Sequence, residues 1–377
     1  MSLLFTSPLE FKERTVAGTA KDFMVVRFIS LAGTNEQIGE KLAQIASSRH
    51  GVKPATGDPK LIADRLRWQA EHWPENYARA QGVAKAFGNQ SPEFDPTSLN
   101  YDMDVEPGCS VTYYPGSSVT NGHPMLSRNY DFPTVTLAEM TGRVAPEGAR
   151  AMTADPYVVE MRPDNGFASL YIASYDLLSG CIDGINEKGL AVALLADDQA
   201  QDKRPSEGIG LSEIRLTRFL LDRCASAKEA RAALATVPFN YQMVPCHYMI
   251  CDASGDSFVW EITPDLKKRY VTDGKGLPQV VTNHLLAEYN AENLPEGNSF
   301  DRFRRLQSEI AQRKGKVTPA EATTINACVA VPKDTQGHAT LWHSVYDLKE
   351  RSMSVSFFLG RDAAGIERRS PYYAFKL

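Results

Sequence analysis

The stretch that decides the fold runs from residue 106 to residue 132 and reads EPGCSVTYYPGSSVTNGHPMLSRNYDF. Cys109 follows Gly108 directly and opens an alternating run, CSVTYYP, that is typical of a β-strand. A second strand-like run, PMLSRNYDF, begins just after Asn121-Gly122, a dipeptide that favours hairpin turns because both residues tolerate positive φ. The pattern predicts a β-hairpin with a cysteine at the start of its first strand.

A cysteine in this position needs help to act as a nucleophile. The thiolate attacks, not the thiol, and a free cysteine has a pKa of about 8.5. One source of help is a histidine base, as in papain-like enzymes, and His284 and His343 are the candidates. A second is cleavage before the cysteine, so that its new α-amino group, with a pKa of about 7.7–8.0, becomes the nearby base. That solution needs a small residue before the nucleophile and a strand starting at it, and Gly108-Cys109 provides both.

The second strand of the hairpin carries two charged residues that would return toward Cys109. Arg128 would supply a permanent positive charge that stabilises a thiolate. Asp131 would accept hydrogen bonds from the new ammonium group and orient it. The alternative interpretation of this pair is a surface ion pair of little energetic weight.

The composition is that of an ordinary globular protein, with 43% hydrophobic and 23% charged residues among 377. A net charge of −5 predicts no nucleic-acid partner and no anionic membrane partner. No apolar run approaches the roughly 18 residues of a membrane-spanning helix. The N-terminal residues show no secretory signal, which predicts a cytoplasmic location, although a trimmed signal would leave the same sequence. No HExxH, GxGxxG or Walker pattern occurs, so we expect no metal and no other cofactor.

The rest of the chain alternates between helical and strand-like segments. Residues 88–107 are rich in Pro, Asp and Asn and predict an exposed linker that leads into Gly108-Cys109. Apolar spacing predicts helices over 36–50, over 59–87 with an interruption near Pro74, over 212–224 and over 226–234. It predicts further hairpins over 247–262 and 339–360. This succession predicts an α+β fold of antiparallel sheets with helices packed outside them. We expect the five cysteines other than Cys109 to be buried free thiols.

The segment GCS…NGHPMLSRNYDF resembles the opening of one group of N-terminal nucleophile (Ntn) hydrolases, the choloylglycine hydrolases and acyl-CoA:isopenicillin-N (6-aminopenicillanic acid) acyltransferases, which are peptidase C45-like. In that group a cysteine begins the mature catalytic chain. The resemblance continues along the chain in the segments DGINEKGLAVALL (183–195), VVTNHL (280–285) and NSFDRFRRL (298–306).

The resemblance implies a four-layer αββα sandwich and self-cleavage between Gly108 and Cys109. Residues 1–108 would then be a propeptide that becomes the small α subunit, and residues 109–377 would be the catalytic β subunit of an α/β heterodimer. It further implies Asn283 as an oxyanion donor and Arg302 as a second active-site arginine.

One segment departs from the family pattern. Bile-acid hydrolases have an asparagine donor several residues beyond NEKGL, and this chain reads AVALLADD there. A backbone N–H near Ala196 would have to replace that donor, because an oxyanion site normally needs two.

These observations favour hydrolysis of a linear, non-peptide amide through an acyl thioester on Cys109, with a small-molecule acyl-amide as substrate. The alternative within the class is N-acyl transfer from an acyl-CoA. The alternative outside it is an uncleaved, non-catalytic binding protein, and the sequence leaves homo-oligomerisation open. Four aromatic residues could line an acyl pocket, but we expect them to pack in the core: Tyr113, Tyr130, Phe132 and Tyr175.

Overall fold

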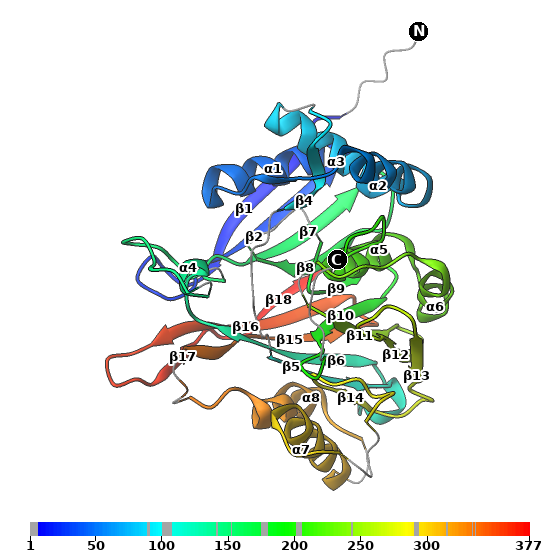
Figure 1. Ribbon diagram of the computed structural model, residues 1–377. Coiled ribbons are helices and arrows are strands. Elements are labelled where there is room, and N and C mark those ends of the chain that lie inside the picture. Colours follow the sequence, from blue (N-terminus) through cyan, green and yellow to red (C-terminus); the bar gives the residue numbers. More distant parts are fainter. Residues whose placement is uncertain are drawn as a thin grey trace.

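The computed structural model describes residues 7–88, 91–99, 108–140, 142–151, 153–174, 180–200, 206–242, 244–289, 294–313, 316–333, 335 and 337–377. Two β-sheets lie face to face, and helices cover the outer face of each (Figure 1). The predicted α+β class and αββα layering are confirmed. In the described part of the chain, no helix has the length and apolar character needed to cross a membrane.

The first sheet has nine strands in the order β1-β2-β7-β8-β9-β10-β11-β12-β13. Their bounds are β1 Glu10–Ala17, β2 Val26–Gly33, β7 Tyr157–Pro163, β8 Ser169–Ala173, β9 Asp183–Asn186, β10 Ala191–Ala196, β11 Cys246–Cys251, β12 Ser257–Ile262 and β13 Arg269–Asp273. The expectation of purely antiparallel sheets is wrong at one place, because β2 and β7 pair in parallel. The hairpin β1–β2 joins this sheet by pairing with β7. In the chain, β7 comes after β5 and β6, which belong to the other sheet.

The second sheet has the order β14-β5-β6-β15-β16-β17, with β18 also pairing β16. Its strands are β5 Gly108–Tyr114, β6 Met125–Pro133, β14 Gln279–Val281, β15 His338–Asp347, β16 Ser352–Arg361, β17 Glu367–Arg369 and β18 Tyr373–Lys376. The hairpin β5–β6 is confirmed, but its connection is longer than a two-residue turn. The connection includes a 3₁₀ turn at Gly116–Ser118, and of the two expected turn residues only Gly122 has a positive φ, +74°.

The predicted linker over 88–107 is wrong in part. Residues Phe94–Leu99 form strand β4, which pairs with β3 (Pro54–Thr56) in a small two-stranded sheet. Asp95 explains why a Pro- and Asp-rich stretch takes this shape. Its buried carboxylate accepts bonds from the backbone N–H and the hydroxyl of Thr97 and pairs with Arg65. Residues 89–90 and 100–107 of the expected linker lie outside the described residues.

The helices form the two outer layers. Helices α1 (Asn35–His50), α2 (Pro59–His72), α3 (Pro74–Phe87), α5 (Glu213–Arg223) and α6 (Ala227–Thr236) cover the nine-stranded sheet. Helices α7 (Asn298–Gln312) and α8 (Pro319–Thr324), with a 3₁₀ turn at Ile325–Val329, cover the seven-stranded sheet. The four-residue helix α4 (Leu137–Met140) follows β6 and does not belong to this layer. The predicted helices are therefore confirmed, including the break before Pro74.

Three apolar cores fill the spaces between the layers. The middle core lies between the sheets and includes Tyr113, Tyr130 and Phe132, as expected for packing residues, whereas Tyr175 lies outside the described residues. The cysteines other than Cys109 are free thiols and buried, except Cys328, which is half-buried.

Helices α1 and α3 cross so closely that their backbones touch at two glycines. A Cβ added to Gly82 would lie 2.0 Å from the carbonyl oxygen of Glu36, and one added to Gly39 would lie 2.1 Å from that of Arg79. We therefore predict that Gly82→Ala lowers the free energy of unfolding by about 1–3 kcal/mol or more, because the helices must move apart. Urea denaturation measures this change. Gly57→Ala is the control, since its new methyl would meet only Ile62 Cδ1 at 3.8 Å; an equal loss in both variants would contradict the prediction.

Candidate active site

The hairpin β5–β6 sets the position of the candidate nucleophile. Its register pairs Cys109 with Tyr130 and Gly108 with Asp131. Arg128 lies two residues before Tyr130, so its side chain is on the same face as that of Cys109 and diagonal to it. Asp131 lies on the opposite face. The hairpin thus places both charged residues at the start of β5, on either side of the sheet.

Arg128 is fully buried and contacts the thiol directly. Its Nη2 lies 3.3 Å from Cys109 Sγ and donates to the carbonyl oxygen of Leu194 at 2.7 Å. Its Nη1 lies 2.7 Å from Oδ1 of Asp183, which is also fully buried.

Asp183 was not among the residues predicted from the sequence. Its Oδ2 accepts hydrogen bonds from Ser344 Oγ and Tyr346 Oη, each at 2.8 Å. These two residues come from β15 of the other sheet, so the carboxylate links the two sheets beneath the thiol. The sequence signal was its place at the start of DGINEKGLAVALL, the segment quoted above for its family resemblance.

Asn283 and Arg302 bind the backbone of Cys109 rather than its sulfur. The Cys109 N–H donates to Asn283 Oδ1 at 2.7 Å, and Arg302 Nη1 donates to the Cys109 carbonyl oxygen. Arg302 also donates to Asn283 Oδ1 through Nη2 and to Ser110 Oγ through Nη1, both at 2.8 Å. Asn283 Nδ2 donates to the carbonyl oxygen of Ala196 at 2.8 Å. Asn283 and Arg302, both predicted from the sequence, thus meet at the backbone of Cys109.

Asp131 packs against Gly108, the residue that precedes Cys109. A Cβ added to Gly108 would lie 3.1 Å from Asp131 Cβ, so the position favours glycine for lack of space. Thr340 Oγ1 donates to Asp131 Oδ1 at 2.5 Å. Burial raises the pKa of the Asp131 carboxyl to about 6, against the lowering effect of the Thr340 hydrogen bond and of Arg302 and Arg128.

The thiol itself is closed off in the intact chain, with an exposed fraction of 1%. Burial raises the pKa of the Cys109 thiol, and the positive charge of Arg128 opposes that rise. The sulfur is therefore out of reach of a substrate in this form.

The two histidines considered as bases are occupied elsewhere. His343 Nε2 bonds to Ser127 Oγ at 2.8 Å and its Nδ1 to Tyr372 Oη at 2.5 Å, while His284 Nδ1 bonds to Ser299 Oγ at 2.8 Å. Burial lowers the pKa of both imidazoles to about 3. Neither histidine contacts Cys109, so a papain-like Cys-His pair does not form with them.

Another buried pair, not predicted from the sequence, supports the segment that carries Asn283. His247 Nε2 bonds to the carbonyl oxygen of Thr282 at 2.7 Å, and its Nδ1 lies 3.3 Å from Glu261 Oε1. The Glu261 carboxylate also accepts the backbone N–H groups of Leu286 and Ala287. These bonds grip the segment on both sides of Asn283 and thereby fix the position of its amide.

Solved structures resemble this architecture at low sequence identity. A variant of the conjugated bile acid hydrolase from Clostridium perfringens superposes with a TM-score of 0.51 at 16% identity, over 72% of this chain and 92% of its own. Penicillin V acylase from Agrobacterium tumefaciens gives a TM-score of 0.44 at 22% identity (66% and 82% covered). A Caenorhabditis elegans orthologue of N-acylethanolamine-hydrolyzing acid amidase gives 0.43 at 14% identity (71% and 99% covered). No curated protein sequence matches the chain.

The αββα layers are those of an Ntn-hydrolase fold, and the chain is an enzyme of that class. More narrowly, it belongs to the acyl-coenzyme A:6-aminopenicillanic acid acyl-transferase family, whose sequence model matches residues 119–361. This match confirms the resemblance drawn from the sequence. The match begins in the β5–β6 connection, after Cys109, so the case for Cys109 as the candidate nucleophile rests on the geometry of the site.

The buried ion pair between Arg128 and Asp183 gives a test of what holds the guanidinium in place. We predict that Asp183→Asn lowers the free energy of unfolding by about 3–5 kcal/mol, because it leaves Arg128 as an unpaired buried charge. Asp155→Asn is the matched control, since Asp155 pairs with Arg27 at 3.1 Å with both side chains partly exposed, and its loss should stay within about 1 kcal/mol. Equal losses in urea denaturation would show that the Asp183 charge does not hold Arg128.

Proposed function

We propose that the chain is a cysteine Ntn hydrolase that cuts its own Gly108–Cys109 bond and then hydrolyses linear amides through an acyl thioester on Cys109. The observation that carries this proposal is the Arg128 guanidinium, 3.3 Å from the Cys109 sulfur. A thiol in an apolar core is a poor nucleophile because burial disfavours its thiolate. A fixed, fully buried positive charge beside it is the group that opposes this effect.

Self-cleavage begins with attack of Cys109 Sγ on the carbonyl carbon of Gly108. The bond from that carbon to the Cys109 nitrogen breaks, the nitrogen takes the thiol proton, and a thioester links Gly108 to the sulfur. Water then hydrolyses the thioester, which gives a carboxylate on Gly108 and a free thiol and α-amino group on Cys109. Asp131, packed against Gly108, accepts hydrogen bonds from the new ammonium group. The products are a small subunit of residues 1–108 and a catalytic subunit of residues 109–377.

In turnover the α-amino group takes the thiol proton, and the thiolate attacks the carbonyl carbon of the substrate amide. Asn283 Nδ2 and the backbone N–H of Ala196 stabilise the oxyanion. In the intact chain Asn283 Nδ2 binds the Ala196 carbonyl, so this bond is exchanged for one to the substrate oxygen. The C–N bond then breaks, the amine leaves with the proton from the α-ammonium, and water hydrolyses the acyl thioester to a carboxylic acid.

The second candidate is N-acyl transfer from an acyl-CoA, which the description of the matched family favours. The same acyl thioester on Cys109 would form with loss of the CoA thiol, and an amine instead of water would resolve it. Hydrolysis is our first choice because water is always present as acceptor. The two activities differ in the acyl donor and in the final acceptor, not in the nucleophile.

Intact-mass spectrometry tests the self-cleavage. We predict two polypeptides, 1–108 and 109–377, from the wild-type chain and one uncut chain from Cys109→Ala, because only the sulfur can form the thioester. Cys246→Ala is the control, since this thiol is equally buried but bonds to the carbonyl of Val244, and it should be cut like the wild type. An uncut wild type, or a cut Cys109→Ala variant, would refute the mechanism.

Acyl trapping tests the reaction class. The cleaved protein is incubated with a panel of linear acyl-amides, or with acyl-CoA thioesters with and without an amine, and is then quenched in acid. We predict that the 109–377 polypeptide gains the acyl mass on Cys109 from the amides and that the free acid accumulates. Adducts from acyl-CoA alone, resolved only by an amine, would establish the transferase instead. Absence of any adduct across both panels would favour a non-catalytic binding protein.

A further inference from the structure

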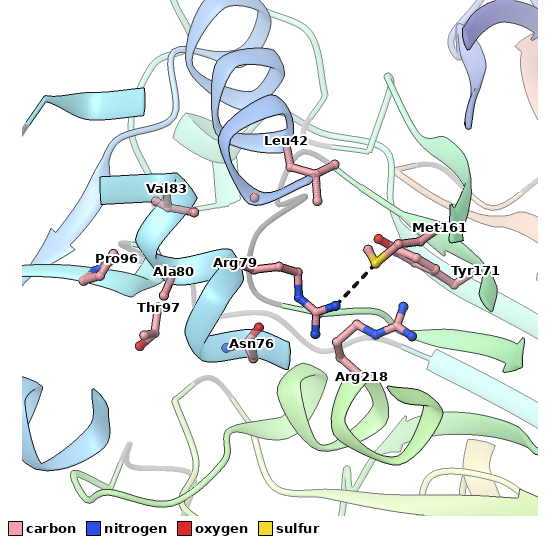
Figure 2. Close-up of a pocket in the computed structure, with 12 residues that line it drawn as sticks. Leu42, Asn76, Arg79, Ala80, Val83, Pro96, Thr97, Met161, Tyr171 and Arg218 are labelled. Carbon is pink, nitrogen blue, oxygen red and sulfur yellow. Dashed lines mark hydrogen bonds between the residues drawn. The ribbon is translucent and has the colours of Figure 1, made fainter. Parts of the chain in front are cut away.

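A small cavity lies between the N-terminal helices and the nine-stranded sheet, on the face of that sheet turned away from Cys109. Its volume is about 20 Å³, and Leu42, Arg79, Met161, Tyr171 and Arg218 are among the residues that line it (Figure 2). A cavity needs roughly 10–15 Å³ on this measure to hold one water molecule. The space therefore admits one water or one monatomic ion and excludes phosphate, sulfate or a carboxylic acid.

The charges around this cavity do not balance. Arg79 Nη2 and Arg218 Nη2 both contact the carboxylate of Asp222, the latter at 3.0 Å. All three side chains are buried, with exposed fractions of 7%, 4% and 0%. Asp222 is the only carboxylate in the described part of the chain that forms an ion pair with either guanidinium. Among the described residues, the cluster thus carries one excess positive charge on side chains that are buried.

The excess charge comes with unused hydrogen-bond donors. Arg218 Nη2 donates to Ser169 Oγ at 2.8 Å, whereas its Nε and Nη1 are buried without a hydrogen-bond partner among the described residues. Its guanidinium carbon lies 4.8 Å from the ring centroid of Tyr171. Arg79 Nη1 donates to Asn35 Oδ1 at 3.0 Å and to the weak acceptor Met161 Sδ at 3.4 Å. Figure 2 shows the two guanidinium groups close together in the cavity.

We propose that this cavity binds one halide ion, chloride under ordinary conditions. A buried charged donor without a partner carries a large desolvation penalty, and a neutral water would satisfy hydrogen bonds but leave the excess charge. A monovalent monatomic anion would accept hydrogen bonds from the unpartnered donors, neutralise the excess positive charge and fit the cavity volume. The ion would connect Arg79 on α3 with Arg218 on α5, and so hold the 1–108 segment against the rest of the molecule. The proposal does not depend on self-cleavage, because the site is complete in the intact chain.

Thermal unfolding of the full chain tests the proposal at one fixed ionic strength, with chloride replaced stepwise by gluconate, which is too large for the cavity. Because a ligand that binds only the folded state stabilises it, the Tm in chloride should exceed that in gluconate by roughly 2 °C or more. Arg218→Met should abolish this difference. Arg223→Met is the matched control, since Arg223 lies on the same helix, is partly exposed and pairs with Glu75 instead of Asp222, and it should retain the difference.

Equal Tm values of the wild type in chloride and gluconate would overturn the proposal, as would a chloride effect that Arg218→Met leaves unchanged. A second measurement needs no variant and decides the matter if Arg218→Met does not fold. Crystals of the wild-type chain soaked in bromide should show an anomalous scattering peak between the guanidinium groups of Arg79 and Arg218. Density there without an anomalous signal would identify a water molecule and refute the halide site.

Discussion

The position of the Cys109 sulfur depends on one buried charge, the guanidinium of Arg128. A charge without exposed surface is tolerated only when ion-pair and hydrogen-bond partners surround it. Those partners come from both sheets: Asp183 and Leu194 from the nine-stranded sheet, and Cys109 from the seven-stranded sheet. The need to satisfy Arg128 therefore fixes the spacing and lateral position of the two sheets at this point, and with them the place of the thiol.

The 1–108 segment is part of the sandwich and not an appended domain. Its strand β2 pairs in parallel with β7 along seven residues, and its helices α1 and α3 cover the nine-stranded sheet. Trp73 and Arg79 of this segment both contact Asp222 on α5 inside the core. A cut between Gly108 and Cys109 would remove none of these contacts. On the proposed mechanism, the two pieces therefore stay together for the same reasons that hold the intact chain.

The features predicted correctly from residue patterns are those that depend on residues close together in the chain. The hairpin β5–β6 brings Arg128 and Asp131 to Cys109 because all three lie on neighbouring strands that follow each other directly in the chain. The Arg128–Asp183 contact was not predictable in this way, because it joins two different sheets and strand periodicity defines a face but not a partner. The parallel pairing of β2 with β7 was missed for the same reason.

Other parts of the site followed from the family resemblance and not from periodicity. Asn283 and Arg302 lie far along the chain from Cys109, and only the matching segments pointed to them. Strand β4 was missed because its Pro- and Asp-rich composition is typical of loops, yet the side chain of Asp95 satisfies local donors that a loop would leave to water.

The network around Cys109 is compatible with both reactions of the proposed mechanism, self-cleavage and turnover. Asn283 and Arg302 hold the backbone nitrogen and carbonyl of Cys109, and Arg128 holds its sulfur. None of these bonds requires residue 108, so the network can hold Cys109 in the same place as an internal residue and as a chain terminus. In the intact chain both ends of the Asn283 amide are occupied, by the Cys109 N–H and by the Ala196 carbonyl. The proposed cut would change the Cys109 nitrogen from an amide into an amino group. An amide nitrogen cannot accept a proton at neutral pH, whereas an amino group can, so the cut would give the site its own base.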